Sequence, residues 1–121
     1  MAKHFLVWGI VIALVIGGIA YVKVVEPAMN NHDELAKCLS ANGAMMYGAY
    51  WCPHCQEQKK MFGKSVKYMS HIDCAVRGST EILQICKDAG VENFPTWKFR
   101  SGEKVTGIIP LDRLARLAGC E

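Results

Sequence analysis

The sequence predicts an α/β domain in which helices flank a mixed β-sheet, preceded by one apolar N-terminal helix. Three observations lead to this fold class: an uncharged run near the N-terminus, strand-like and helix-like segments that alternate after it, and a hairpin pattern near the C-terminus. Strands that alternate with helices and end in a hairpin are typical of a mixed sheet covered by helices. A chain of 121 residues has room for one such domain.

The N-terminal apolar run extends from Phe5 to Val22 and contains no charged residue. As an α-helix it would span about 27 Å, close to the hydrocarbon thickness of a bilayer. Lys3 precedes the run, and positive charge before a first membrane helix favours a cytoplasmic N-terminus. We therefore expect residues 1–25 to be a single-pass anchor in the cell membrane, with the catalytic domain extracytoplasmic. A cleaved signal peptide is the alternative and also exports the domain; a buried helix of a soluble fold is a third interpretation.

The rest of the chain is nearly neutral and contains all the cysteines. Lys3 and Lys23 precede it, so 12 of the 14 basic residues remain against 11 acidic residues, and no basic surface argues for nucleic acid. Six cysteines, an even number in a small exported domain, indicate disulfide bonds. Such a small core is marginal without cross-links. Residues 26–32 are expected to be a linker and residues 33–121 the folded domain.

The first part of the domain is predicted to run helix, strand, helix. Asp33 is expected to cap a helix over residues 33–42 that Gly43 ends. Residues 44–50 form an apolar run of strand length. A second helix follows directly from Cys52, with lysines near its expected C-terminal end.

The second part is predicted to run strand, helix, hairpin, helix. Residues 66–74 alternate apolar and polar side chains, as a strand does, and residues 79–90 carry an apolar stripe at helical spacing. Residues 94–109 form the hairpin, with the turn at 101–104, and residues 111–119 close the chain as a helix.

The candidate active site is the pair Cys52 and Cys55, which follows a predicted strand. A helix that begins at Cys52 offers unpaired N–H groups that stabilise its thiolate. Cys55 lies one turn deeper and is expected to be more shielded, so Cys52 would attack and Cys55 would resolve. Pro53 and His54 lie between them, and a charged His54 would stabilise the thiolate further, which makes the disulfide more oxidising. Trp51 is expected to shape the site. Thiol–disulfide exchange by the two cysteines needs no cofactor.

Other chemistries also use this cysteine spacing. Haem attachment requires a histidine directly after the second cysteine, where Gln56 stands. Zinc requires two further ligands, which Cys74, Cys86 or His71 would supply without a second close pair. Thiolates also suit Cu(I), so a copper-binding chaperone is the alternative function from another class. A third candidate function is a redox-inactive scaffold that uses the fold only for protein contact. Of these alternatives we expect none, and we expect no bound metal.

A second candidate feature is the segment Phe94–Pro95–Thr96. Proline can open a strand because its missing N–H is tolerated there. Few X–Pro bonds in folded proteins are cis. The place of Pro95, after a helix, before a hairpin and downstream of the cysteine pair, nevertheless makes a cis Phe94–Pro95 bond the expectation.

Together these residues resemble the thioredoxin family, through Trp-Cys-Pro-His-Cys at 51–55 and Phe-Pro-Thr-Trp at 94–97. More narrowly, residues 46–63 resemble the thioredoxin-like domain fused to bacterial homologues of vitamin K epoxide reductase. Residues 71–74 and 84–97 extend that similarity. The resemblance covers most of the segment after the apolar run.

The resemblance implies specific roles for the site residues. Cys52 matches the attacking cysteine of the family and Cys55 the buried one. Pro95 matches the cis-proline beside the active site, and the residue before it, Phe94, offers backbone hydrogen bonds to a substrate strand. Phe94, Pro95 and Thr96 are therefore the candidate substrate-binding residues.

The resemblance also implies a direction and partners. Thioredoxin and protein disulfide isomerase carry a buried acid six residues before the first cysteine, where this chain has Met46. The Pro-His pair between the cysteines is that of the periplasmic oxidant DsbA, so both features favour oxidation of protein thiols. The expected partners are exported cysteine-containing proteins and a separate membrane quinone-linked protein of the vitamin K epoxide reductase type. A reductase fed by a membrane electron carrier is the alternative.

The other four cysteines are candidates for structural disulfides. A Cys74–Cys86 bond would close a loop of about a dozen residues and stabilise the fold by roughly 3 kcal/mol. A Cys38–Cys120 bond would join the two ends of the domain and contribute about 4–5 kcal/mol. Four cysteines allow three pairings, of which we favour this one; buried free thiols are the alternative.

Overall fold

The computed structural model describes residues 1–24 and 32–121. In chain order the elements are α1 (Ala2–Val24), α2 (Asp33–Ala41), β1 (Met45–Gly48), α3 (Pro53–Phe62), the 3₁₀ helix η1 (Gly63–Tyr68), β2 (His71–Asp73), α4 (Gln84–Asp88), β3 (Thr96–Lys98), β4 (Lys104–Thr106) and α5 (Leu111–Ala118). The predicted alternation of helices and strands is therefore present, although two elements differ in extent.

The N-terminal helix α1 is long and apolar enough to cross a membrane. Its window Ala2–Tyr21 has a mean hydropathy of 2.1, and none of that window is buried. A membrane span and a signal sequence both fit these properties. Of the predicted linker over residues 26–32, all but His32 lies outside the described residues.

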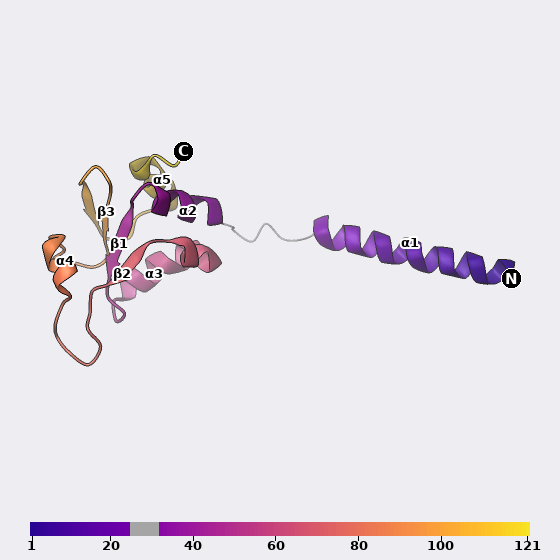
Figure 1. Ribbon diagram of the computed structural model, residues 1–121, viewed down its shortest axis with the longest axis horizontal. Coiled ribbons are helices and arrows are strands. Elements are labelled where there is room, and N and C mark those ends of the chain that lie inside the picture. Colours follow the sequence, from indigo (N-terminus) through magenta and orange to yellow (C-terminus); the bar gives the residue numbers. More distant parts are fainter. Residues whose placement is uncertain (25–31) are drawn as a thin grey trace.

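The four strands form one mixed sheet with the order β2-β1-β3-β4 (Figure 1). β1 runs parallel to β2 and antiparallel to β3, and β3 and β4 form the expected antiparallel hairpin. The fold class that the sequence predicts, a mixed sheet flanked by helices after an apolar helix, is thus confirmed.

Successive residues of β1 face opposite sides of the sheet, as the period of a strand requires. Met46 belongs to the larger core cluster, with Leu39 of α2, Phe62 of α3 and Leu114 of α5. Tyr47 belongs to the smaller cluster, which contains Cys86 of α4. The active-site helix α3 therefore shares one face of the sheet with α2 and α5, and α4 lies on the other face (Figure 1).

The predicted strand over residues 66–74 is wrong in its first half. The chain continues from α3 into the 3₁₀ helix η1, and only His71–Asp73 pairs with the sheet. The reason is a tertiary contact: Ser65 is buried and its hydroxyl donates to Asp33 Oδ1 at 2.6 Å. Asp33 is accordingly the first residue of α2 and not its cap, since the N-cap residue is His32.

The predicted helix over residues 79–90 is also too long, because α4 covers only Gln84–Asp88. The segment before α4 folds back on itself, with a β-bridge between Ala75 and Ile82 and a hydrogen bond from Leu83 N to Cys74 O at 2.9 Å. Five residues of helix cannot bury the whole predicted stripe, and Ile85 is 54% exposed.

Candidate functional site

The first cysteine of the pair lies where β1 turns into α3. Cys52 is the N-cap residue of α3, in an extended backbone conformation, and Pro53 begins the helix. Its own N–H donates to Ala49 O at 3.0 Å, which closes the turn between strand and helix. Proline suits this position because the first helical N–H has no partner within the helix. Cys52 thus stands at a helix N-terminus, as the sequence predicts.

The Cys52 sulfur accepts a hydrogen bond from within the pair. Cys55 N donates to Cys52 Sγ at 3.2 Å, and both cysteines are free thiols in this structure. An N–H donor and the positive end of the helix dipole both stabilise negative charge on that sulfur. The geometry therefore favours Cys52 as the nucleophile.

Cys55 is held in its protonated form. Burial, the hydrogen bond with Cys52 and the charge of Cys52 together raise the pKa of its thiol from 9.0 to about 12, with burial the largest cause. The two residues differ little in exposure, at 5% for Cys52 and 2% for Cys55. The expected difference in shielding is therefore small, and the hydrogen bond to Cys52 Sγ is what distinguishes the two sulfur atoms.

The Cys55 sulfur packs against the backbone of β1. A Cβ atom placed on Gly48 would lie 3.2 Å from Cys55 Sγ and 3.4 Å from Met46 Cε. Glycine at position 48 thus permits a close approach that a side chain would obstruct. Met46 is fully buried, so the position that is acidic in thioredoxin carries an apolar side chain here.

The second predicted feature lies beside the first. The Phe94–Pro95 peptide bond is cis, and the Phe94 ring meets Trp51 edge-on with the ring centroids 6.1 Å apart. Trp51 is 56% exposed. Trp51 precedes Cys52 directly, so this contact brings the Phe94–Pro95 segment to the turn that carries the cysteine pair.

The remaining predicted site residues differ in their exposure. Thr96 is buried, and its hydroxyl donates to Asn93 O at 2.7 Å and lies 2.9 Å from Thr106 Oγ1. The Thr96 side chain is therefore engaged within the hairpin. His54, in the first turn of α3, is exposed to solvent.

Sequence reasoning missed Asp73, which ends β2. Its Oδ1 accepts hydrogen bonds from Tyr50 N at 3.1 Å and Ala75 N at 3.2 Å. The Arg77 guanidinium lies over the Tyr50 ring, 4.3 Å from its centroid. Asp73 and Arg77 thus fix the turn before Cys52 from a neighbouring strand and loop. Asp73 lies inside the predicted strand over residues 66–74, so the sequence pattern gave no signal for this role.

Gln58, one turn after Cys55 on α3, was also missed. It is fully buried, and its side-chain amide makes two hydrogen bonds to the backbone of Ile109. These bonds hold the active-site helix to the segment that enters α5.

The other four cysteines form two disulfides, Cys38–Cys120 and Cys74–Cys86, with Cα atoms 5.9 Å apart in each. These are the pairs that the sequence led us to expect. Two of the cysteines considered as zinc ligands are therefore bonded to one another. Within residues 1–24 and 32–121, no group of three or more His, Cys, Asp or Glu side chains is placed to hold a metal ion.

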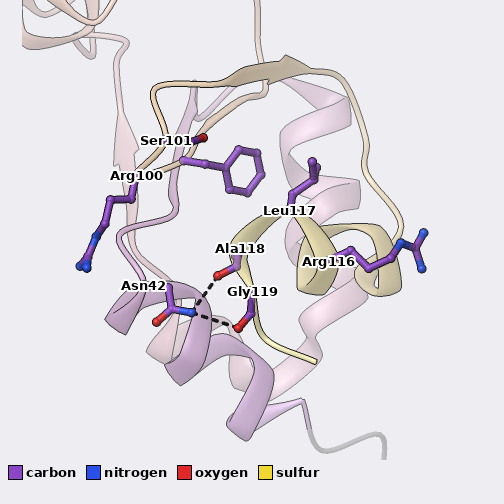
Figure 2. Close-up of a pocket in the computed structure, with 8 residues that line it drawn as sticks. Asn42, Arg100, Ser101, Arg116, Leu117, Ala118 and Gly119 are labelled. Atoms are coloured by element: carbon purple, nitrogen blue, oxygen red, sulfur yellow. Dashed lines mark hydrogen bonds between the residues drawn. The ribbon is translucent and has the colours of Figure 1, made fainter.

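A pocket lies beside Asn42 (Figure 2). Asn42 Nδ2 is 3.6 Å from both sulfur atoms of the Cys38–Cys120 bond. Asn42 lines the pocket, and its Nδ2 donates to Ala118 O at 2.7 Å and to Gly119 O at 3.4 Å. None of the predicted site residues lines this pocket. Its lining residues are Asn42, Phe99, Arg100, Ser101, Arg116, Leu117, Ala118 and Gly119.

A comparison with known proteins finds a relative of this chain in Arabidopsis thaliana. The two sequences are 45% identical over 89 residues, and the relative is named thiol-disulfide oxidoreductase LTO1. The match covers 70% of this chain but only 23% of the relative, so the chain spans less than a quarter of that protein. No family model matches the chain. The similarity supports the thioredoxin-like resemblance of the domain.

Proposed function

We propose that this protein is a membrane-anchored, extracytoplasmic thiol–disulfide oxidoreductase that oxidises protein thiols through a Cys52–Cys55 disulfide. The observation that carries the proposal is the hydrogen bond from Cys55 N to Cys52 Sγ at the N-terminus of α3. This bond favours the reduced, thiolate form of Cys52. A disulfide whose reduced form is more stable is a stronger oxidant.

The proposed reaction transfers two electrons from a substrate dithiol to the cysteine pair. A substrate thiolate attacks Cys52 Sγ, the Cys52–Cys55 bond breaks, and Cys55 leaves and takes up a proton. A pKa of about 12 keeps Cys55 in the thiol form once it has been released. The second substrate thiolate then attacks the substrate sulfur of the mixed disulfide. The substrate leaves with a disulfide, and Cys52 remains as a thiolate that Cys55 N stabilises.

Met46 supports the oxidising direction. Reduction of a substrate disulfide would end with Cys55 attacking the mixed disulfide, which requires Cys55 to lose its proton. A buried acid near the second cysteine assists that transfer in thioredoxin, and Met46 supplies none. The raised pKa of Cys55 therefore slows this resolving attack.

The substrates in this proposal are exported proteins with cysteines, and α1 holds the domain at the membrane. The exposed Trp51 and the half-buried Phe94 ring beside it offer a surface next to the cysteine pair for an extended substrate chain, with Pro95 buried beneath. The reduced pair would be reoxidised by a separate membrane quinone-linked protein of the vitamin K epoxide reductase type. The similarity to a much longer thiol-disulfide oxidoreductase supports the redox class of the domain.

The reduction potential of the Cys52–Cys55 pair tests the direction. We expect equilibrium with glutathione to give a value nearer to that of DsbA, about −120 mV, than to that of thioredoxin, about −270 mV. A value near that of thioredoxin would contradict oxidation and favour a reductase fed by a membrane electron carrier.

Trapping tests the class of reaction and identifies the substrates. A Cys55→Ala variant is expected to accumulate mixed disulfides between Cys52 and exported proteins, because no resolving cysteine remains. A Cys52→Ala variant is the matched control and should accumulate none. Absence of adducts, together with stoichiometric Cu(I) binding that Cys52→Ser abolishes, would indicate a copper chaperone instead.

A further inference from the structure

Two lysines from different elements converge on one surface aromatic ring. Lys37 Nζ, on α2, lies 4.7 Å from the centroid of the Tyr68 ring, and Lys67 Nζ, on η1, lies 5.0 Å from it. Tyr68 is 36% exposed, so the ring and both ammonium groups lie at the surface. Two cations therefore gather at one site, although like charges repel.

Lys64 extends this cluster along η1. Residues three apart eclipse one another in a 3₁₀ helix, so Lys64 and Lys67 project from the same face. Ser65 faces the opposite way, into the domain, where it bonds to Asp33. We refer to Lys37, Lys64, Lys67 and Tyr68 as the lysine face; all four residues are exposed.

In the described part of the chain, fewer carboxylates than lysines lie near the lysine face: Glu34, and Asp33, which accepts from Ser65. Lys37 pairs with Glu34 at 3.6 Å, an exposed i,i+3 contact of the kind that contributes little. In the described part of the chain, neither Lys64 nor Lys67 has a carboxylate within ion-pair distance. An anionic surface would thus meet a net positive patch with an amphipathic ring at its centre.

The lysine face lies at the end of the domain that the connection from α1 enters. The Ser65–Asp33 hydrogen bond joins η1 to the first residue of α2, and Figure 1 shows the start of α2 and the end of α3 at the same end of the domain. Eight peptide units separate Val24, the last residue of α1, from His32. Even a fully extended chain of that length reaches only about 28 Å.

We propose that the lysine face binds the anionic lipid headgroups of the membrane that holds α1. The proposal rests on the anchoring role of α1 in the proposed function. Lysines close to a membrane surface are attracted by anionic lipids, and tyrosine rings favour the headgroup level. The short connection keeps this end of the domain close enough for such contacts to form repeatedly.

Docking in this way sets the orientation of the active site. Cys52 is the N-cap residue of α3, and η1 follows the C-terminal end of that helix. A ten-residue helix is about 15 Å long, so a bilayer at the lysine face leaves Cys52 at the far end of α3. The cysteine pair then faces away from the lipid, towards exported proteins.

Lysine acetylation of the full chain in vesicles tests the docking. We expect Lys37, Lys64 and Lys67 to react at least threefold more slowly in vesicles with phosphatidylglycerol than in pure phosphatidylcholine. High salt should abolish the difference, because exposed charges are screened. Lys98 and Lys104, on the hairpin, should react equally in both. Equal rates at the lysine face, or an equal decrease at the hairpin lysines, would overturn the proposal.

A charge-matched pair of variants separates docking from general attraction. Lys37→Gln/Lys64→Gln/Lys67→Gln should lose the lipid-dependent protection of η1 amides from hydrogen exchange. Lys87→Gln/Lys98→Gln/Arg113→Gln loses the same amount of charge elsewhere on the domain and should keep the lipid-dependent protection of the η1 amides. The same result for both variants would overturn the proposal.

Failure of the anchor and failure of docking give different results. If carbonate extracts the full chain from the vesicles, α1 is not an anchor and docking falls with it. If the chain is retained and the acetylation rates are equal in both lipids, docking alone is wrong. Oxidation of a reduced test peptide by the same vesicles reports the proposed activity independently.

Discussion

Gln58 binds both polar groups of one buried residue, Ile109. Gln58 Nε2 donates to Ile109 O at 3.0 Å, and Ile109 N donates to Gln58 Oε1 at 2.7 Å. Both residues are buried, so neither backbone group of Ile109 has water as an alternative partner. The pair fastens α3 to the segment that enters α5, one helical turn from Cys55.

Replacing this glutamine should destabilise the domain strongly. Gln58→Leu leaves the Ile109 N–H and carbonyl without partners, at an expected cost of roughly 2–4 kcal/mol in the free energy of unfolding. Urea denaturation measures this cost. Gln84→Leu is the control, because Gln84 is exposed and should change stability by about 0.5 kcal/mol or less. Similar losses in the two variants would contradict the role of Gln58.

The thiol of Cys55 should stay protonated far above neutral pH. Its pKa of about 12 predicts that the ultraviolet thiolate signal lost in Cys55→Ala appears only as the pH approaches 12. In Cys52→Ala the pKa of Cys55 should fall but remain above 9.0, because burial is the largest cause of the shift. A Cys55 titration at or below pH 9.0 in the reduced protein would contradict this interpretation.

The same pKa predicts how stability depends on pH. An unfolded Cys55 loses its proton near pH 9.0, whereas the folded protein keeps it until about pH 12. The contribution of the protonated Cys55 to the free energy of unfolding is therefore fully present below pH 9.0. It is lost as the pH rises towards 12. Thermal melts of the reduced protein should show a steeper loss over this range than melts of Cys55→Ala; parallel curves would refute the shift.

A methyl group at Gly48 should disturb the cysteine pair. Gly48→Ala places Cβ 3.2 Å from Cys55 Sγ, and such overpacking typically costs about 1–3 kcal/mol. The cost should be smaller in a Cys55→Ala background, where the sulfur is absent. A double-mutant cycle from denaturation curves measures the coupling, and strictly additive losses would show that Cys55 Sγ is not what the methyl group meets.

The two structural disulfides should contribute unequally. The Cys38–Cys120 bond spans 82 residues and the Cys74–Cys86 bond 12. In the chain-entropy model, paired serine substitutions should cost about 4–5 kcal/mol for the first bond and roughly 3 kcal/mol for the second. Denaturation with Cys52 and Cys55 reduced in every sample isolates these effects. A larger loss at the shorter loop would contradict the entropic origin.

The sequence predicted those parts of the site whose causes are contiguous in the chain. A strand followed by Cys52, with Pro53 after it, is enough to place that cysteine at a helix N-terminus. The position of Pro95, between a helix and a hairpin and downstream of the cysteine pair, was enough to expect a cis bond. Local chemistry decides the first feature, and the order of motifs along the chain was enough for the second, so neither expectation required knowledge of the tertiary structure.

Where the prediction failed, distant contacts decide the structure. Alternation over residues 66–68 suggested a strand, but the buried Ser65 bonds to Asp33, 32 positions away, and η1 forms. Apolar spacing over residues 79–83 suggested a helix, but that segment folds back through the Ala75–Ile82 bridge.

The supporting residues of the site escaped notice for the same reason. Gln58 and Asp73 act through partners 51 and 23 positions away, respectively. Periodicity describes only neighbours in the chain, so it gives no sign of such pairs.

The bond between Cys38 and Cys120 has a consequence for biogenesis. During synthesis Cys38 emerges first, and the other four cysteines all emerge before Cys120 does. Oxidation in order of emergence would join Cys38 to Cys52, and six cysteines allow fifteen complete pairings in all. Native pairing thus requires either late oxidation or correction of early errors by thiol exchange. The folding of this protein thus depends on the same thiol–disulfide exchange that we propose it catalyses in other proteins.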